Sequence, residues 1–404
     1  MFLRYTYARL RAGSLARPVL LCMGLLDELL TGFPTIALPL LRDRLALSYA
    51  QVGFLFTAAV LAGMVIDPFV NLWSDRGSKK PWVLGGLVLI ALTTLLMGHL
   101  MSYPLLLLAF MVWYPANGAG VGLAQAVLID FSPSDAARTM TRWTLLSSVG
   151  DFLAPLVVAA FVALGFGWSE LCWLGAACWF GAAMILAPLR FPGQRTSSET
   201  EEGTEEEKLS IWLALRAALR DPLLLRWSAL TLIPNMLDEV FLGFVALYLR
   251  DALRLDEAMI AFILTLHMIA SFLGLFLLDR VLKRRKLAPV PALFWLSVVT
   301  LLGVVALLLF HALWVAIGAL FVISFCCAGW YPLTQAEAYA QRPDSSGLVR
   351  VVIGFGAPFE MVLPGVVGLV SASFGVLAGL GVLGLAPVLM LLLLPYRRSR
   401  RETE

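Results

Sequence analysis

Charged residues are scarce in this sequence. Lys, Arg, Asp and Glu together make up 14% of its 404 residues, while hydrophobic residues make up 60%. An average soluble domain has about 25% charged residues and roughly 45–50% apolar residues. So little polar surface does not suffice to cover a folded chain in water. The composition therefore excludes an ordinary soluble domain and indicates that lipid surrounds most of the chain.

Other absences exclude several classes of function. The net charge is only +3 and no basic domain stands apart from the apolar runs, so we expect no nucleic-acid partner. The five cysteines lie in apolar stretches without metal-ligand spacing, and the adjacent Cys326 and Cys327 would form a strained disulfide. We therefore predict membrane packing for the cysteines, no metal and no cofactor. A membrane-embedded enzyme would also need a nucleophile, a metal cluster or a His-Asp array at one membrane face, and we find none. We predict that the protein is not an enzyme.

Long apolar runs are abundant instead. A transmembrane helix needs about 20 predominantly apolar residues. Twelve such runs occur in two groups of six, and we predict an all-α membrane protein with two pseudo-symmetric six-helix bundles. The expected spans are residues 18–41, 49–73, 82–101, 103–129, 143–165 and 168–189, followed by 224–249, 258–278, 290–310, 313–336, 348–372 and 375–394.

The basic residues predict the orientation of these spans. Lys and Arg accumulate on the cytoplasmic side of membrane proteins. With the N-terminus inside, only about 4 of the 30 Lys and Arg residues fall outside, namely Arg42, Arg44, Arg250 and Arg254. The basic N-terminus and its apolar run imitate a signal peptide, but the run is too long and lacks a cleavage site. We expect both termini in the cytoplasm and the spans in the plasma membrane, as in a bacterial cell.

An acidic segment separates the two groups of spans. The stretch RTSSETEEGTEEEK, starting at Arg195, has no apolar residue and predicts a disordered linker. The next segment, LSIWLALRAALRDP, suits either a short helix at the membrane interface or an extension of the seventh span. We expect residues 1–190 as the first bundle, 191–222 as a cytoplasmic linker and 223–404 as the second bundle.

The two groups also repeat one another. LDELLTGF from Leu26 matches LDEVFLGF from Leu237, and DRGSKK from Asp75 matches DRVLKR from Asp279. WYP occurs in the fourth and the tenth span, and an Ala-Pro pair occurs in the fifth and the eleventh. Because these matches keep the same order at a nearly constant offset, they indicate a duplicated six-helix unit.

With this duplication, the sequence resembles the major facilitator superfamily over essentially its whole length. The family loop signature, Gly-x-x-x-Asp-Arg-x-Gly-Arg followed by Lys or Arg, corresponds to NLWSDRGSKK at residues 71–80. Asn71 and Ser78 replace glycines, and Lys79 replaces an arginine. The Gly-x-x-x-Gly-Pro motif of antiporters corresponds to Gly150-x-x-x-Ala154-Pro155. The chain resembles the drug:proton antiporter and fosmidomycin-resistance branches, although the arginine that proton-coupled drug exporters carry in span four is missing.

Carboxylates inside the spans are the main candidate site residues. A charge at the bilayer centre costs from about 2.5 to over 10 kcal/mol, so such acids are rare. In the family architecture, spans three, six, nine and twelve are outer supports, and these carry no acid in their interiors. We find no Lys or Arg at midplane depth. Each acid is therefore predicted to carry a proton, to pair with a cationic substrate, or to bond within the protein as packing. The candidates are Asp27, Glu28, Asp238, Glu239, Asp151 and Glu360.

Other side chains are candidates for the same cavity. His267 in span eight is predicted either to relay protons or to pack. Without cationic groups in the cavity, an anionic substrate is disfavoured. Aromatic side chains suit an apolar or cationic ligand, or else pack against helices and lipid. The candidate cavity aromatics are Phe33, Trp113, Tyr114, Phe241, Phe244, Trp330 and Tyr331.

The loop charges have a different predicted role. By resemblance to the family, Asp75, Arg76 and Lys79 form a cytoplasmic gate with Asp130 at the end of span four. Asp67 is a further candidate for this cluster, and Arg138 and Arg142 are candidates to compete in it. Such a latch is a two-state element that alternating access requires.

Together these features predict a monomeric secondary transporter that moves a small molecule by alternating access. Proton-coupled export of a small lipophilic or cationic compound is the leading hypothesis, with protons and the lipid bilayer as the other partners. A proton-coupled metabolite importer or a lipid or lysolipid flippase on the same fold is the alternative. A membrane enzyme or sensor is the rival from another class.

Overall fold

The structure is a computed structural model that describes residues 2–47, 49–99, 102–131, 133–191, 213–284, 288–343 and 345–395. Its side chains are described from Leu15 onward, and those of Glu239 and Glu360 lie outside the described set. Within these ranges the regular secondary structure consists of helices, so the all-α prediction is confirmed. Eleven described helical segments are long and apolar enough to cross a membrane, and they fall on the predicted spans two to twelve. The first predicted span falls on α1 (Phe2–Ile36).

The remaining helices of the first half follow the predicted order closely. They are α2 (Leu38–Leu45), α3 (Tyr49–Ser74), α4 (Lys80–His99), α5 (Tyr103–Asn117), η1 (Gly118–Gly122), α6 (Leu123–Phe131), η2 (Pro133–Asp135), α7 (Ala136–Ala163) and α8 (Trp168–Leu186). The fourth predicted span is thus one helix with a five-residue π-helical turn, η1, in its middle.

The second half is more interrupted. Its helices are α10 (Pro222–Leu232), η3 (Ile233–Leu237), α11 (Glu239–Asp251), α12 (Glu257–Arg284), α13 (Pro289–Leu309), α14 (Leu313–Cys327), α15 (Trp330–Ala340), α16 (Ser346–Gly354), α17 (Ala357–Phe374), α18 (Val376–Leu383) and α19 (Ala386–Leu393). The predicted spans seven, ten, eleven and twelve are each divided.

Prolines mark the divisions of the seventh, eleventh and twelfth predicted spans. Pro234 lies in the first turn of η3, Pro358 in that of α17, and Pro387 in that of α19. Proline has no backbone N–H and is best tolerated in the first turn of a helix, so each of them marks a new start. The apolar runs predicted the positions of these candidate membrane spans, and the structure adds interruptions within them.

The segment after the acidic run is a helix of its own. Residues 213–218 are helical, and α10 starts anew after Asp221. The Asp221 carboxylate accepts hydrogen bonds from the backbone N–H groups of Leu223 and Leu224, at 3.1 and 3.2 Å, as an N-terminal cap does. A continuous extension of the seventh span is therefore excluded. The acidic run itself lies outside the described residues.

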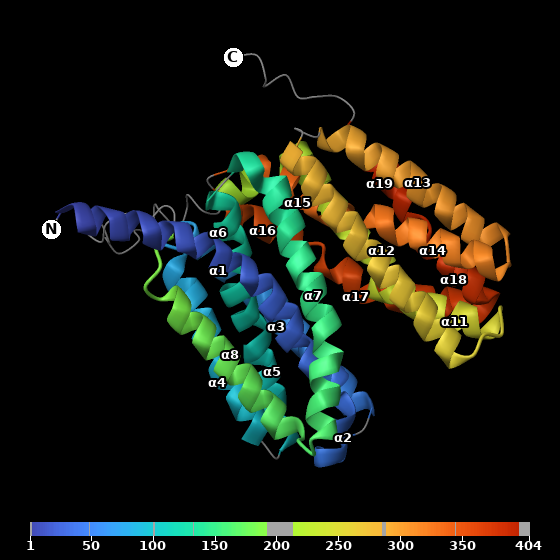
Figure 1. Cartoon of the computed structure of the whole chain (residues 1–404), viewed down its shortest axis with the longest axis horizontal. Helices are drawn as coiled ribbons and strands as arrows, with labels where there is room; N and C mark the ends of the chain where they lie inside the picture. The colour runs from blue at the N-terminus through green and yellow to red at the C-terminus, as the bar shows by residue number, and fades with distance from the viewer. Residues whose placement is uncertain are drawn as a thin grey trace. The chain divides into compact units, whose positions relative to one another are not determined.

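The chain divides into two compact units that do not follow one cut in the sequence. Unit 1 contains the described residues of 1–134, 143–214 and 343–351, and unit 2 contains those of 135–142, 215–342 and 352–404. In unit 1, α4 packs along α5 and α8, and in unit 2, α14 packs along α12 and α13 (Figure 1). The first residues of α7 thus belong to unit 2, and most of α16 belongs to unit 1.

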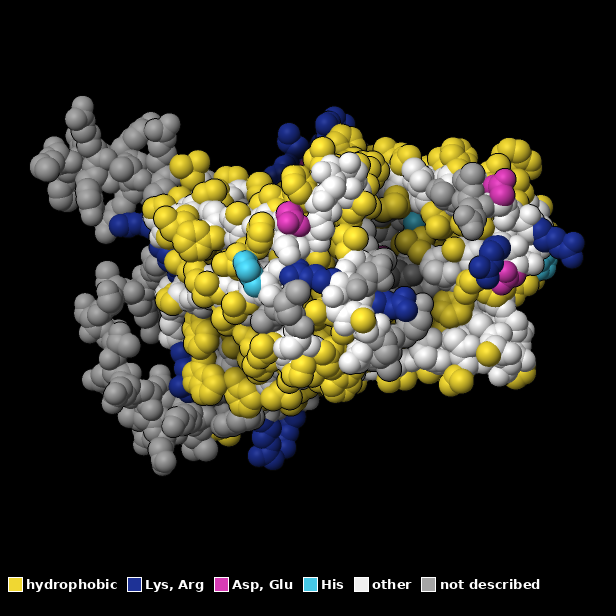
Figure 2. Space-filling model, turned by 90° about the horizontal axis from the view of Figure 1, so that it is seen from below, with side chains coloured by type: hydrophobic (Ala, Val, Ile, Leu, Met, Phe, Trp, Pro, Cys, Tyr) yellow, Lys and Arg dark blue, Asp and Glu magenta, His cyan; other side chains and the backbone are white. Residues whose placement is uncertain are grey.

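The surface agrees with a lipid environment. Figure 2 shows hydrophobic side chains spread across one face, with few charged ones among them. Large apolar side chains that are at least half exposed occur on helices of both units, for example Val65, Leu108, Met184, Leu302 and Leu369. A water-soluble protein rarely exposes so much contiguous apolar surface.

Candidate functional site

Asp27 lies on α1 among groups from two other helices of unit 1. Its carboxylate accepts a hydrogen bond of 3.0 Å from the side-chain amide of Asn117, the last residue of α5. Gly150 brings α7 so close to the backbone of α1 that a Cβ atom at position 150 would have no room. The neighbouring Asp151 therefore lies near enough for its charge to act on Asp27. The structure thus brings together two of the predicted carboxylates.

Arg350 is a basic residue near this region that the sequence did not single out. The residue lies on α16, and its guanidinium donates a hydrogen bond of 3.2 Å to the backbone carbonyl of Gly122. Its charge acts on the carboxylates of both Asp27 and Asp67. Arg350 falls inside a predicted span, and a charge in an apolar run is itself a signal of function. The sequence did not reveal the neighbours of Arg350, because the approach of α16 to α3 and η1 is a tertiary contact.

The π-helical turn η1 makes room for these charges. A Cβ atom at Gly118 would lie 2.7 Å from Oδ1 of Asp67, and a Cβ atom at Gly122 would overlap the guanidinium of Arg350. The backbone N–H of Leu123 bonds to the carbonyl of Gly118, five residues earlier, as in a π-helix. Oδ1 of Asp67 is buried and has no hydrogen-bond partner. The sequence GAGVG therefore allows an acid and a base to approach one helix from the side.

The equivalent acids of the second repeat have a different setting. Asp238 lies at the break between η3 and α11, with an exposed side chain, whereas Asp27 lies within the uninterrupted α1. The charge of Asp238 acts on the thiol of Cys327, at the end of α14. Discontinuous helices recur at the binding sites of transporters. Glu28 is half-buried on α1, and the side chains of Glu239 and Glu360 are outside the described set.

His267 is buried on α12 in unit 2. Its ring is hydrogen-bonded to the backbone of Leu320, while its Nδ1 atom is buried without a partner. The ring centroid lies 6.4 Å from that of Phe241, and Ser324 donates a hydrogen bond of 2.7 Å to the backbone carbonyl of His267. These contacts hold the ring against α11 and α14.

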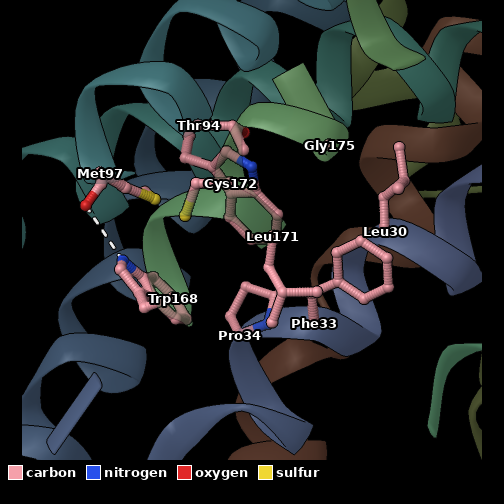
Figure 3. A pocket seen from close by; sticks show the side chains of 10 residues that line it. Leu30, Phe33, Pro34, Thr94, Met97, Trp168, Leu171, Cys172 and Gly175 are labelled. Atoms are coloured by element: carbon pink, nitrogen blue, oxygen red, sulfur yellow. Dashed lines mark hydrogen bonds between the residues drawn. The ribbon is translucent and has the colours of Figure 1, made fainter. Parts of the chain in front are cut away.

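The predicted cavity aromatics do not form one group. Phe33 and Trp113 line a small apolar pocket of unit 1, whose volume of about 20 Å³ holds no more than a water molecule (Figure 3). Figure 3 shows side chains of α1, α4 and α8 around it, and Trp168 donates a hydrogen bond of 3.0 Å to the carbonyl of Met97. The lining residues are Leu30, Phe33, Pro34, Thr94, Met97, Trp113, Trp168, Leu171, Cys172 and Gly175.

The remaining aromatics differ in exposure. Trp330 and Phe241 are fully buried in unit 2, and Phe244 and Tyr331 are half-buried. Tyr114 is 38% exposed and lies over Gly63 of α3, one helical turn before Asp67. Of the predicted aromatics, Tyr114 is therefore the one placed beside the charged groups around η1.

The loop carboxylate Asp75 binds the start of α16. Its two oxygens accept hydrogen bonds from the backbone N–H groups of Gly347 at 2.9 Å and Leu348 at 2.7 Å. These N–H groups belong to the first turn of the helix, which has no intrahelical acceptors for them and carries a partial positive charge. Gly347 packs directly on the backbone of Asn71, where a side chain would not fit.

Lys79 completes this cluster. Its ammonium lies 3.0 Å from Asp75 and 2.9 Å from Asp130, and Ser346 donates a hydrogen bond of 3.3 Å to Asp130. Burial alone would lower the pKa of Lys79, but the charges of Asp75 and Asp130 outweigh it and raise the pKa, so Lys79 stays charged. Arg76 is half-buried in the same turn. The predicted grouping of Asp75, Lys79 and Asp130 is thus present.

Arg138 and Arg142 have another partner than the one expected. They lie on the first turns of α7, and their Nε atoms are 3.1 and 2.9 Å from the same oxygen of Asp279 on α12. The prediction that they compete for the Asp75 cluster was wrong. Asp279 matches Asp75 in the sequence repeat, so each repeat uses this aspartate to hold the start of a helix from the other repeat.

Apolar helices in two compact units and a duplicated sequence are typical of a membrane protein built from two repeats. The family model of the Major Facilitator Superfamily matches residues 20–340, so the chain belongs to this superfamily. It is therefore a multi-pass membrane transporter for small molecules rather than an enzyme, as the sequence resemblance predicted.

Individual relatives are distant. The chain is 28% identical over 149 residues to the phosphoglycerate transporter protein of Salmonella typhimurium, covering 36% of this chain and 32% of that one. It is 25% identical over 179 residues to the fosmidomycin resistance protein of Escherichia coli, covering 40% and 38%. The chain thus spans between about a third and two fifths of these relatives' length. The solved outward conformation of the superfamily transporter FucP superposes with a TM-score of 0.70 at 17% identity, over 95% of this chain and 98% of that one. This confirms the fold.

Proposed function

We propose that the protein exports a small lipophilic or cationic compound in exchange for protons. The observation that carries this proposal is the placing of acidic side chains near η1: Asp27 accepts a hydrogen bond from Asn117 at 3.0 Å, and Asp67 lies against Gly118. Carboxylates within an apolar bundle favour binding of a proton or another cation, because a charge is costly in a low-dielectric interior. The similarity to a fosmidomycin resistance protein supports export.

In the proposed cycle, Asp27 alternates between a proton and the passenger. Its hydrogen bond from Asn117 orients the carboxylate. Asp238, exposed at a helix break, is the proposed counterpart in the second repeat.

The clusters of Asp75 and Asp279 are the proposed cytoplasmic latches. Each ties a loop aspartate of one repeat to the first turn of a helix from the other repeat. Alternating access requires contacts that hold one face closed and break when the other face closes. The basic residues that surround both aspartates agree with the cytoplasmic side.

A metabolite transporter for anions is the second candidate. Arg350 and the similarity to a phosphoglycerate transporter protein favour it. Transport assays distinguish export of a cation from transport of an anionic metabolite. Proteoliposomes are loaded with ethidium, a lipophilic cation, or with radiolabelled 3-phosphoglycerate, and a pH gradient is then imposed.

The proposal predicts that the gradient drives ethidium movement, that an uncoupler abolishes it, and that Asp27→Asn removes the response to the gradient. Gradient-driven movement of 3-phosphoglycerate with no movement of ethidium would replace export of cations by the second candidate. Asp251→Asn, at an exposed ion pair with Arg250, is the matched control that should transport like the wild type.

A further inference from the structure

We propose that Arg350 is a positioning residue that keeps the turn η1 in its π-helical form and thereby sets the rotation of α6, the helix that carries Asp130. This inference goes beyond the proposed exchange of protons for a passenger and depends on neither of them. Neither Arg350 nor an interruption of the fourth span was predicted from the sequence.

The turn η1 contains one residue more than an α-helical turn. In an α-helix each backbone N–H bonds to the carbonyl four residues earlier, whereas the N–H of Leu123 bonds to the carbonyl of Gly118, five residues earlier. Single π-helical turns inside α-helices are rare and occur frequently at functional sites. If η1 became α-helical, the extra residue would pass into α6 and turn that helix by about 100°, the angle between successive residues of an α-helix.

Three neighbouring elements pack against η1. The carboxylate of Asp67 on α3 lies against the first residue of the turn, and Gly86 on α4 packs backbone to backbone on Gly120 in the middle. The guanidinium of Arg350 on α16 lies against Gly122, the last residue, and donates a hydrogen bond of 3.2 Å to its carbonyl. Arg350 therefore holds η1 at the point where α6 begins.

The helix α16 contacts α6 at both of its ends. Arg350 binds the carbonyl of Gly122 directly before α6, and Ser346, four residues before Arg350, donates a hydrogen bond of 3.3 Å to Asp130 near the end of α6. Asp130 also lies 2.9 Å from the ammonium of Lys79. All of these residues belong to unit 1. A rotation of α6 by one residue would therefore carry Asp130 away from both Ser346 and Lys79.

The rotation of α6 is thereby linked to the proposed cytoplasmic latch. The backbone N–H groups that bind Asp75 lie on the first turn of α16, the same nine-residue helix that carries Arg350. A displacement of α16 would withdraw Arg350 from η1 and Ser346 from Asp130 together. Release of the latch would then free α6 to turn.

Methylation of Lys79 reports the rotation of α6, because an amine reacts only in its uncharged form and the charge of Asp130 helps to keep Lys79 protonated. Purified protein in lipid nanodiscs is treated with formaldehyde and cyanoborohydride, and mass spectrometry compares Lys79 with the neighbouring Lys80. Asp130→Asn sets the full effect, a rise of about tenfold if the pKa of Lys79 falls by one unit. Arg350→Met keeps the length of the side chain but removes its donors, and it should label Lys79 as fast as Asp130→Asn does.

Deletion of Ala119 from η1 is the decisive variant. The deletion removes the extra residue, so the fourth span can be α-helical throughout while α6 keeps its rotation. By itself it should leave Lys79 labelled at the wild-type rate. Combined with Arg350→Met, it should restore the wild-type rate, because no extra residue is left to pass into α6. A merely structural effect of Arg350→Met on α16 would not be reversed in this way.

Deletion of Leu108 is the matched control, because this residue lies in the α-helical part of the same span with its side chain 57% exposed. Losing a residue there turns everything that follows, so this variant should unfold at a lower temperature than the Ala119 deletion and label Lys79 faster. Arg350→Lys keeps a donor and should keep labelling slow.

Three results would each overturn the inference. They are labelling of Lys79 at the wild-type rate in Arg350→Met, labelling of the double variant as fast as that of Arg350→Met, and unfolding or aggregation of the Ala119 deletion like that of the Leu108 deletion. None of these measurements involves a proton gradient or a passenger. The ethidium assay therefore tests the proposed function separately, and either proposal can fail while the other stands.

Discussion

At the scale of single residues, the positions without a side chain are as informative as the charged ones. Gly118 and Gly122 are needed because Asp67 and Arg350 occupy the space where a Cβ atom would be. Neither glycine has an unusual backbone conformation that would demand glycine by itself, since positive φ angles at described glycines occur at Gly165 and Gly375. Their requirement comes from close approach.

Gly122→Ala therefore tests whether Arg350 docks on η1. The added methyl group displaces the guanidinium, which then loses its hydrogen bond to the Gly122 carbonyl, and a hydrogen bond from a charged group contributes about 1.5–3 kcal/mol. We expect a lower thermal unfolding temperature in detergent micelles and loss of the Arg350 contact. Gly85→Ala is the control, because a Cβ atom there meets nothing within 4 Å. In a helix, that change should be neutral or stabilise by up to about 1 kcal/mol. Equal unfolding temperatures for the two variants would contradict the packing described here.

At the scale of elements, the first turn of the short helix α16 is stabilised by a residue from another part of the chain, Asp75. The carboxylate of Asp75 accepts two backbone hydrogen bonds from its first turn, and hydrogen bonds to charged groups contribute roughly 1.5–3 kcal/mol each. The matching contact at the start of α7 uses two arginine side chains and Asp279 instead. The same sequence repeat thus produces two chemically different anchors.

Asp75→Asn should release the start of α16. An amide keeps an acceptor oxygen but loses the charge that favours a helix N-terminus. Hydrogen–deuterium exchange at residues 346–350 should rise by about tenfold, as expected for a loss near 1.4 kcal/mol. Asp251→Asn, in an exposed pair that contributes little, serves as the control. Unchanged exchange in Asp75→Asn would show that this anchor is unimportant.

Asp279→Asn should have its effect at the start of α7. Arg138 and Arg142 would lose the shared carboxylate, and the two guanidinium groups would then repel each other. We expect faster exchange at residues 136–142 and unchanged exchange at 346–350. Faster exchange at 346–350 alone would show that Asp279 does not anchor α7.

The helices themselves could largely be predicted from the sequence, whereas their interruptions and the charge partners could not. Apolar runs are local, so the spans were placed well. The π-helical turn lies in close contact with Asp67 and Arg350, which a local pattern does not reveal, whereas Pro234 marks the interruption before Asp238. The approach of Arg350 to Asp27 joins residues more than 300 positions apart, which no local pattern reveals. The pairing of Asp75 with Lys79 and Asp130 was predicted because a family motif carries it.

At the scale of the whole molecule, the duplicated sequence does not yield two equivalent sites. Asp27 lies in a continuous helix with an amide partner, while Asp238 is exposed at a helix break. We expect unequal roles for them in transport. Asp27→Asn should abolish the response to a pH gradient, and Asp238→Asn should chiefly weaken binding of the passenger. The maximal rate and the half-saturating concentration, measured separately for each variant, distinguish these effects.

The central claim is that Asp27 exchanges a proton for the passenger. Its most direct test records proton release with a pH-indicator dye when a transported cation such as ethidium is added to the purified protein. The wild type should release protons as the cation binds, and Asp27→Asn should bind the cation without releasing them. Equal proton release by the two proteins would contradict the account.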